Sequence, residues 1–406
     1  MKTLAIIAEY NPFHLGHKKQ YERVLEQFSE PKNPVRILNI MSGNFVQRGE
    51  AALLDEKSRA ELALSQGASL VLSIPSLFSA SGARDFAAAG VKIVSRSGVC
   101  LDIACGAENH EDRTFISDMV PLLDQEPDTY REFLAEHLAK GLPYMSARQE
   151  ALKDYFPDYA AKIDTFIRKP NNILALEYAL AIEKENRVRR DLGLKDLKLH
   201  LIPRTGEEGA ISASHIRDLL REENDTSRRI SALEELVPEE TLATLLSSPL
   251  VLSEPFSSLL PLFFNLRSDK DAAQYRDMSE DLAGLIRNGL NSSLKAPLTY
   301  SSLAKELATP YFPETRINRT SLAYLWGIRK DEWAKAQAEG PAFTKVLAYD
   351  ANGRYLLRLM RKLSRLTLIN QKQELFKVQK SPYETLAYQK QVEILSEKYY
   401  EKLRHF

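Results

Sequence analysis

The sequence predicts an α/β fold in which a doubly wound parallel sheet is followed by a mainly helical C-terminal region. Apolar runs of strand length recur in the first part of the chain, and segments with helical periodicity separate them. Strands buried on both faces are continuously apolar, and their alternation with helices is typical of parallel sheets. The apolar runs are Leu4–Ala8, Val35–Met41, Leu70–Ile74 and Val99–Ala104, and the helical segments are Leu15–Glu30, Asp55–Gln66 and Ala80–Ser95.

Composition narrows the class of protein. At 406 residues the chain is too long for one ordinary hydrophobic core, so two or three domains are expected. Basic and acidic side chains number 55 each, so the overall charge does not indicate a nucleic-acid partner. Cys100 and Cys105 fit no zinc spacing and are expected to be buried thiols. No apolar run approaches the ~20 residues of a membrane helix, and a cytoplasmic protein without a membrane partner is expected.

The first predicted strand runs directly into a segment suited to binding phosphate. Asn11-Pro12 ends the strand, because a residue before proline is pushed towards extended geometry. His14 and His17 then share one face of a first helical turn, and Gly16 leaves the backbone accessible. N–H groups at a helix start bind anions, and imidazoles can donate hydrogen bonds to phosphate oxygens. Two simple helix caps are the alternative, which the preceding buried strand and proline turn disfavour.

Loops after other strands are expected at the same edge, because parallel sheets bind ligands at the carboxyl ends of their strands. The loop after the second strand carries Gln47 and Arg48, and the turn Cys105-Gly106-Ala107-Glu108 follows the fourth. Lys57 or Arg59, in the predicted helix Asp55–Gln66, is a further candidate for a phosphate contact. A solvated helix start explains these two cations equally well.

Two amides begin a later apolar helix, and a fifth strand precedes another candidate cation. Asn171 and Asn172 follow Pro170, and one of them suffices as a helix cap. The strand expected at Leu197–Ile202 would bring Arg204 to the edge of the sheet.

A second phosphate-binding segment is expected at Ile211–Arg217. Ser212 or Ser214 would cap a helix whose first N–H groups meet the β and γ phosphates, and Arg217 would clamp them. An ordinary capped helix is the alternative, which the pairing with His14 and His17 disfavours.

From about Thr226 the alternation stops, so the chain divides into residues 1–225 and 226–406. Helical patterns occupy the second part, with a strand possible at Lys345–Tyr349. Spaced basic residues near its end would form one positive helix face, which suits an RNA backbone. These are Arg354, Arg358, Arg361 and Arg365, with Lys362 beside them. A merely solvated helix is the alternative.

Four motifs together resemble the bacterial tRNA(Met) cytidine acetate ligase family of the His-x-Gly-His nucleotidylyltransferase superfamily. They are His14-Leu15-Gly16-His17, Met41–Glu50, Pro170–Leu174 and Ile211–Arg217. The resemblance implies a Rossmann-like sheet domain that binds ATP at residues 1–225 and a helical region at 226–406 that contributes to tRNA binding. It also implies activation of acetate as acetyl-adenylate, without acetyl-CoA. The acetyl group would pass to N4 of the wobble cytidine of elongator tRNA(Met), forming N4-acetylcytidine.

The resemblance also implies the site residues. His14, His17 and Arg217 would be catalytic. ATP would carry Mg²⁺ held mostly by phosphate oxygens, and no metal ligand is expected from the protein. The residues expected to bind ATP are Ile7, Ala8, Glu9, Tyr10, Asn11, Pro12, Phe13, His14, Gly16, His17, Gln20, Gly106, Asn171, Arg204, Ser212 and Ser214. Leu15 replaces the asparagine common in the family, and Cys105 and Ala107 replace its phenylalanine and serine.

Two alternatives remain open at this point. One is a nucleotidylyltransferase acting on a small metabolite, which the long helical second part disfavours. The other is a noncatalytic RNA-binding protein with a vestigial nucleotide fold, which the presence of both histidines and Arg217 disfavours.

Overall fold

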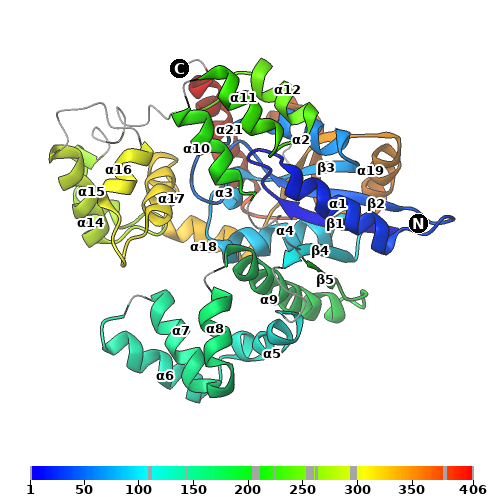
Figure 1. Cartoon of the computed structure of the whole chain (residues 1–406). Coiled ribbons are helices and arrows are strands. Elements are labelled where there is room, and N and C mark those ends of the chain that lie inside the picture. The colour runs from blue at the N-terminus through cyan, green and yellow to red at the C-terminus, as the bar shows by residue number, and fades with distance from the viewer. Residues whose placement is uncertain are drawn as a thin grey trace.

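A seven-stranded sheet forms the centre of the molecule (Figure 1). The computed structural model describes residues 2–107, 112–142, 144–167, 169–203, 211–223, 225–252, 260, 264–292, 300–377 and 382–404. The strand order is β5-β4-β1-β2-β3-β6-β7, and the first five strands are mutually parallel. The strands are β1 (Lys2–Ala8), β2 (Val35–Ser42), β3 (Ala68–Ile74), β4 (Asp102–Ala107), β5 (Lys198–Pro203), β6 (Phe343–Tyr349) and β7 (Thr367–Ile369).

This topology confirms the predicted doubly wound fold. The chain builds β2 and β3 on one side of β1 and then returns to place β4 and β5 on the other. The carboxyl ends of β1 and β4 therefore flank the switch point at which such sheets bind ligands. The strand expected near Lys345 is present as β6, which pairs antiparallel with β3, whereas β7 lacks an apolar run long enough to predict it. The sheet takes strands from both sides of residue 225.

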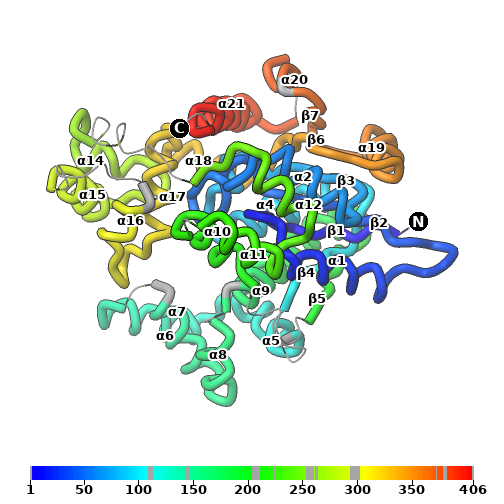
Figure 2. The backbone as a smooth tube through the Cα atoms, turned by 45° about the horizontal axis from the view of Figure 1, so that its top comes forward, coloured from blue at the N-terminus to red at the C-terminus, as the bar shows by residue number. Residues whose placement is uncertain are grey.

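Helices cover both faces of the sheet (Figures 1 and 2). One face packs against α1 (Leu15–Phe28), α2 (Glu56–Ser65), α10 (Ala213–Glu222), α11 (Thr226–Glu234) and α12 (Glu239–Ser247). The other packs against α3 (Ser76–Ser79), α4 (Ala83–Ser97), α9 (Pro170–Asp191) and α19 (Ala351–Leu363). A Cβ at Gly90 of α4 would lie 2.9 Å from the Ile7 side chain, so glycine allows this helix to approach β1 closely.

Two helical groups project from this core (Figure 1). The group at the bottom of the view lies between β4 and α9 in the chain. It comprises α5 (Asp112–Gln125), α6 (Asp128–Ala139), α7 (Tyr144–Tyr155) and α8 (Ala160–Ile167). The group at the left comprises α14 (Asp269–Ala272), α15 (Glu280–Ser292), α16 (Tyr300–Leu307), α17 (Glu314–Leu325) and α18 (Lys330–Glu339). No helix of the described segments is long and apolar enough to cross a membrane.

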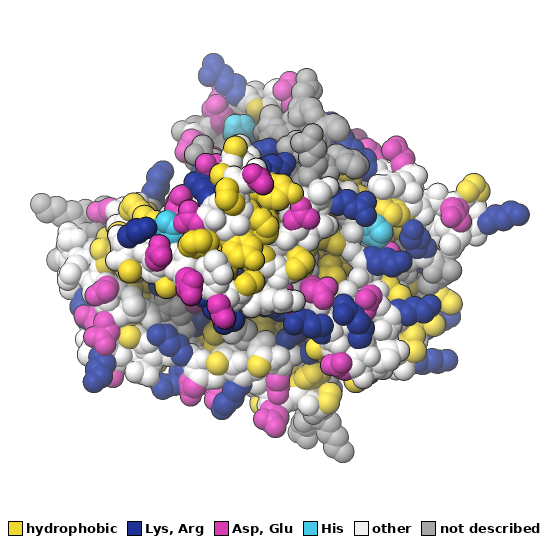
Figure 3. Space-filling model, turned by 90° about the horizontal axis from the view of Figure 1, so that it is seen from below, with side chains coloured by type: hydrophobic (Ala, Val, Ile, Leu, Met, Phe, Trp, Pro, Cys, Tyr) yellow, Lys and Arg dark blue, Asp and Glu magenta, His cyan; other side chains and the backbone are white. Residues whose placement is uncertain are grey.

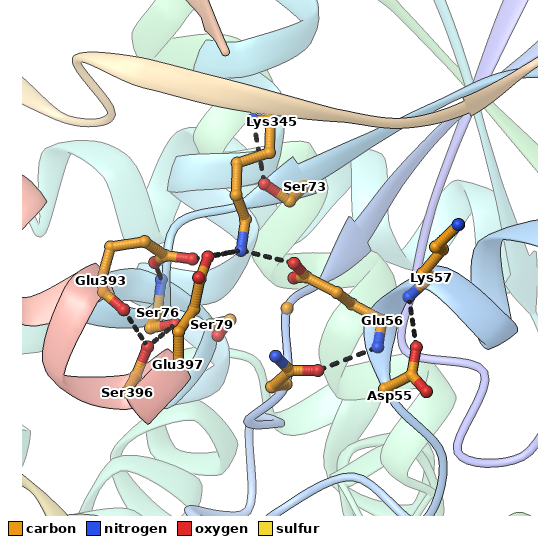
Figure 4. Close-up of polar contacts among 12 residues, drawn as sticks. Asp55, Glu56, Lys57, Ser73, Ser76, Ser79, Lys345, Glu393, Ser396 and Glu397 are labelled. Carbon is orange, nitrogen blue, oxygen red and sulfur yellow. Dashed lines mark hydrogen bonds and ion pairs between the residues drawn. The ribbon is translucent and has the colours of Figure 1, made fainter. Parts of the chain in front are cut away.

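The C-terminal segment is fastened to the sheet by a buried ion cluster (Figure 4). After α20 (Lys372–Lys377), helix α21 (Leu386–Leu403) brings Glu393 and Glu397 to Lys345 of β6. Glu56, in the first turn of α2, points to the same ammonium group. The four residues join three elements that lie far apart in the sequence.

The loop after β2 lies against both α17 and α21. The ring of Phe45 packs edge-on against Trp326, with centroids 4.9 Å apart, and the Tyr400 hydroxyl donates to the carbonyl of Ala52 at 2.8 Å. Gly49 has a φ of +76°, and a Cβ there would lie 2.5 Å from the backbone nitrogen of Arg319. Residues after 225 thus hold the loop after β2 in place.

Candidate active site

A cavity of about 420 Å³ opens at the carboxyl ends of β1, β4 and β5. Its walls come from the starts of α1, α9 and α10 and from the loop after β2. The volume lies within the usual range of small-molecule sites, and the position is the switch point of the sheet. The sequence-predicted loops therefore meet in one place.

The start of α1 forms one wall. The Nδ1 atom of His14 accepts from the N–H of Gly16 at 3.1 Å, and Nδ1 of His17 accepts from the N–H of His14 at 3.2 Å. A neutral imidazole has one accepting nitrogen and one N–H, so Nε2 of each ring carries the hydrogen. The rings stack with centroids 3.7 Å apart, and both line the cavity. Capping and ligand binding are therefore compatible, because capping uses one nitrogen of each ring.

The end of β1 forms the floor beside these histidines. The side chain of Asn11 accepts from the N–H of Leu53 at 2.7 Å, and the Tyr10 hydroxyl contacts that of Tyr21 at 2.9 Å. Burial raises the pKa of Tyr10 well above its usual range, which keeps its hydroxyl neutral. These contacts hold the backbone that leads from the sheet into α1.

Helix α10 forms the opposite wall. The Ser212 hydroxyl accepts from the N–H of His215 at 3.1 Å, so Ser212 is the N-cap. Ser214 also lines the cavity. Arg217 is 7% exposed, and its Nη1 donates to the carbonyl of Asn11 at 2.8 Å. The arginine therefore bridges α10 and the β1–α1 turn, and an arginine keeps its charge even where burial lowers its pKa.

Comparison with known proteins gives the family. Residues 1–405 match the family described as HIGH Nucleotidyl Transferase. A tRNA(Met) cytidine acetate ligase of Acetivibrio thermocellus is 30% identical over 379 residues, which cover 91% of this chain and 88% of that protein. Its namesake in Syntrophomonas wolfei is 31% identical over 387 residues, which cover 92% of this chain and 88% of that protein. The chain belongs to the tRNA(Met) cytidine acetate ligase family. It is a ligase.

A solved structure resembles the whole chain. The crystal structure of Thermotoga maritima TmcAL bound with alpha-thio ATP matches with a TM-score of 0.86 and 27% identity. The match covers 99% of this chain and 95% of that one. The helical second part therefore belongs to the family fold as fully as the sheet does.

Most of the residues that the family resemblance predicts to bind ATP line the cavity. They are Ile7, Ala8, Glu9, Tyr10, Asn11, His14, Gly16, His17, Gln20, Gly106, Asn171, Ser212 and Ser214, together with Arg217. Phe13 is fully buried and packs against Tyr10, with ring centroids 4.9 Å apart, and neither Phe13 nor Pro12 reaches the cavity. Arg204 lies outside the described residues.

Two cations suggested for phosphate lie elsewhere. Lys57 is 76% exposed and faces Glu61 at 3.9 Å. Arg59 is fully buried and donates to the carbonyls of Leu54 and Glu9 at 3.0 and 2.6 Å and to that of Gly43, so it joins the segments that follow β1 and β2. The suggestion of a phosphate contact was wrong for both, because neither side chain reaches the cavity.

Sequence reasoning missed several residues that line the cavity. Arg23 continues the spacing of His14, His17 and Gln20 along α1, which was a usable signal, and its Nη1 donates to the carbonyl of Pro203 at 2.6 Å. The others are Val46, Phe86, Cys105, Leu174, Tyr178, Ile202, Ile211 and Ala213. Gln47 and Arg48, suggested as ligand contacts, also line the cavity. Both cysteines are free and buried, and burial raises the pKa of each thiol to about 12.

Helix α19 presents most of the expected basic face, but it ends at Leu363, so Arg365 lies beyond the helix. Arg354, Arg358 and Arg361 are exposed, whereas Leu356 and Met360 are buried against the core. On the face seen in Figure 3, Lys and Arg are interspersed with Asp and Glu around a central apolar patch.

Proposed function

We propose that this ligase activates acetate with ATP as acetyl-adenylate and transfers the acetyl group to N4 of the wobble cytidine of elongator tRNA(Met), in the cytoplasm. One observation carries the proposal: both histidines, the start of α10 and Arg217 converge on one cavity. The names of the family members support the cytidine of tRNA(Met) as the acceptor of the acetyl group and acetate as its source. The alpha-thio ATP bound to the Thermotoga maritima protein supports ATP as the nucleotide.

The first step makes acetate reactive. A carboxylate oxygen of acetate attacks the α-phosphate of ATP, and pyrophosphate leaves. The Nε2–H groups of His14 and His17 would donate to the α-phosphate as charge builds up, while the first N–H groups of α10 and Arg217 hold the outer phosphates. Such transfer depends on positioning and charge neutralisation, so no covalent nucleophile is needed.

Magnesium would be bound chiefly by the nucleotide. The described residues contain no group of three His, Cys, Asp or Glu that could hold a metal ion. Mg²⁺ commonly uses phosphate oxygens and water with few protein ligands, which suits this cavity. Its contribution would be to neutralise phosphate charge.

The second step transfers the acetyl group to RNA. N4 of the cytosine attacks the acetyl carbonyl, and AMP leaves with the electron pair of the broken C–O bond. No acetyl-CoA is required, because adenylation has already provided the leaving group. The exposed arginines of α19 would contact tRNA phosphates, as part of the contribution of residues 226–406 to tRNA binding.

The experiment is to incubate the purified protein with labelled acetate, ATP and elongator tRNA(Met) and then to analyse the nucleosides of the digested tRNA. Labelled N4-acetylcytidine that requires ATP, without acetyl-CoA, is expected. AMP formation without label in the tRNA would instead indicate another acceptor, and no turnover would indicate a noncatalytic protein.

A further inference from the structure

Glu9 lines this cavity, although a carboxylate is a poor ligand for phosphate or acetate. It is the single carboxylate among the described residues that line it, beside His14, His17 and Arg217. A negative charge disfavours phosphate and acetate, because like charges repel most strongly where water is partly excluded. Such a carboxylate suits a ligand group that donates hydrogen bonds.

One oxygen of Glu9 is fixed and the other is available. Its Oε1 accepts from the N–H of Gln47 at 2.6 Å, while its backbone carbonyl accepts from Arg59. In the part of the chain that the structure describes, Oε2 makes no hydrogen bond. The carboxylate is therefore held at the end of β1 with one oxygen left for a ligand.

The surroundings of Glu9 make it a stronger base than an ordinary glutamate. Arg48, Arg59 and Arg217 face it from the loop after β2, from α2 and from α10, and Tyr178 faces it from α9. The three cations lower its pKa, but burial is the larger effect and leaves the pKa raised. A general base works best with a pKa closer to the working pH.

We propose that Glu9 binds the exocyclic amino group of the acceptor cytosine and takes its proton during acyl transfer. The proposal rests on the proposed function. Carboxylates commonly accept hydrogen bonds from N4 of cytosine, and the N4 lone pair is delocalised into the ring, so removal of a proton assists its attack.

The N4 nitrogen forms a bond to the acetyl carbonyl carbon, and the bond from that carbon to the adenylate oxygen breaks. AMP leaves with the electron pair, the N4 proton passes to Oε2 of Glu9, and Glu9 later releases it to water. Adenylation of acetate precedes this step and needs no proton acceptor.

Adenylation and acetyl transfer can be measured separately, so a loss confined to acetyl transfer indicates a role of Glu9 in that step. In Glu9→Gln the amide oxygen can still accept from the N–H of Gln47, which preserves the loop. We expect acetate-dependent ATP–pyrophosphate exchange to fall much less than acetyl transfer, because adenylation of acetate needs no proton acceptor. Single-turnover acetyl transfer to tRNA should fall by ~10²-fold or more, the usual range for loss of a general base. Its rate should also lose the wild-type rise with pH, and Glu9→Asp should restore part of that rise.

Glu50→Gln is the matched control. Glu50 also acts electrostatically on Arg217 but does not line the cavity. Near-normal transfer in this variant would support proton transfer by Glu9. Three results would each overturn the proposal. In the first, both variants lose acetyl transfer equally. In the others, Glu9→Gln either loses exchange and transfer equally or keeps normal transfer. A wild-type protein that acetylates no tRNA would contradict the proposed function instead.

Discussion

Replacing Lys345 by methionine should destabilise the protein strongly. Its ammonium nitrogen lies 2.6, 2.5 and 2.9 Å from carboxylate oxygens of Glu56, Glu393 and Glu397. The lysine and Glu397 side chains are 8% and 7% exposed, and that of Glu393 is fully buried. Methionine keeps much of the aliphatic volume and removes the charge that these carboxylates require. Breaking a buried ion pair in this way costs about 3–5 kcal/mol.

The loss of folding stability in Lys345→Met should depend on pH. Burial raises the pKa of Glu56 from 4.5, and the Lys345 ammonium partly opposes the rise. Without that ammonium the folded state holds carboxyl protons that the unfolded chain releases, so its stability falls as pH rises above the ordinary glutamate range. The deficit is therefore larger at pH 8 than at pH 5, where protons neutralise the carboxylates.

Thermal unfolding at both pH values measures this effect. With an unfolding entropy of about 2.1 cal/mol/K per residue over 406 residues, the cost lowers Tm by about 4–6 °C near pH 8. The drop should be at least ~2 °C smaller at pH 5. Lys335→Met is the control, because Lys335 is 65% exposed and pairs with Glu332 at 3.5 Å, and its Tm should match the wild type. A Lys345 variant as stable as this control at both pH values would refute the reasoning.

Three further predictions test the site and its supports. His17→Ala should lower adenylation by ~10²-fold or more, measured by ATP–pyrophosphate exchange, and unchanged exchange in a folded variant would remove His17 from the mechanism. Arg358→Ala combined with Arg361→Ala should weaken tRNA binding and reduce its salt slope by about 2, with ATP affinity unchanged; equal tRNA affinity would contradict the role of α19. Gly49→Ala should destabilise the loop after β2 by about 1–3 kcal/mol, because its φ is +76° and a Cβ would meet the backbone of Arg319; an unchanged Tm would contradict this.

The sequence alone predicted the parts of the fold that depend on neighbours in the chain. Continuous apolar runs are a local signal, and β1, β2, β3 and β5 lie within two residues of the predicted runs, whereas β4 begins at Asp102, three residues after the start of the run predicted at Val99–Ala104. Helix capping is also local, so the cap at Ser212 and the start of α1 were predictable. The alternation of strands and helices brought the predicted loops together, because parallel strands end at one edge.

The tertiary structure decided what depends on partners distant in sequence. No local pattern shows that Lys345 would meet Glu393 and Glu397, or that Arg59 would be buried and donate to the carbonyl of Glu9 rather than face a ligand. Glu9 was expected near ATP, but that it is the single carboxylate among the described residues that line the cavity appears only when the walls are assembled. Burial and charge pairing depend on the whole set of neighbours around a side chain, and those neighbours come from segments that only folding brings together.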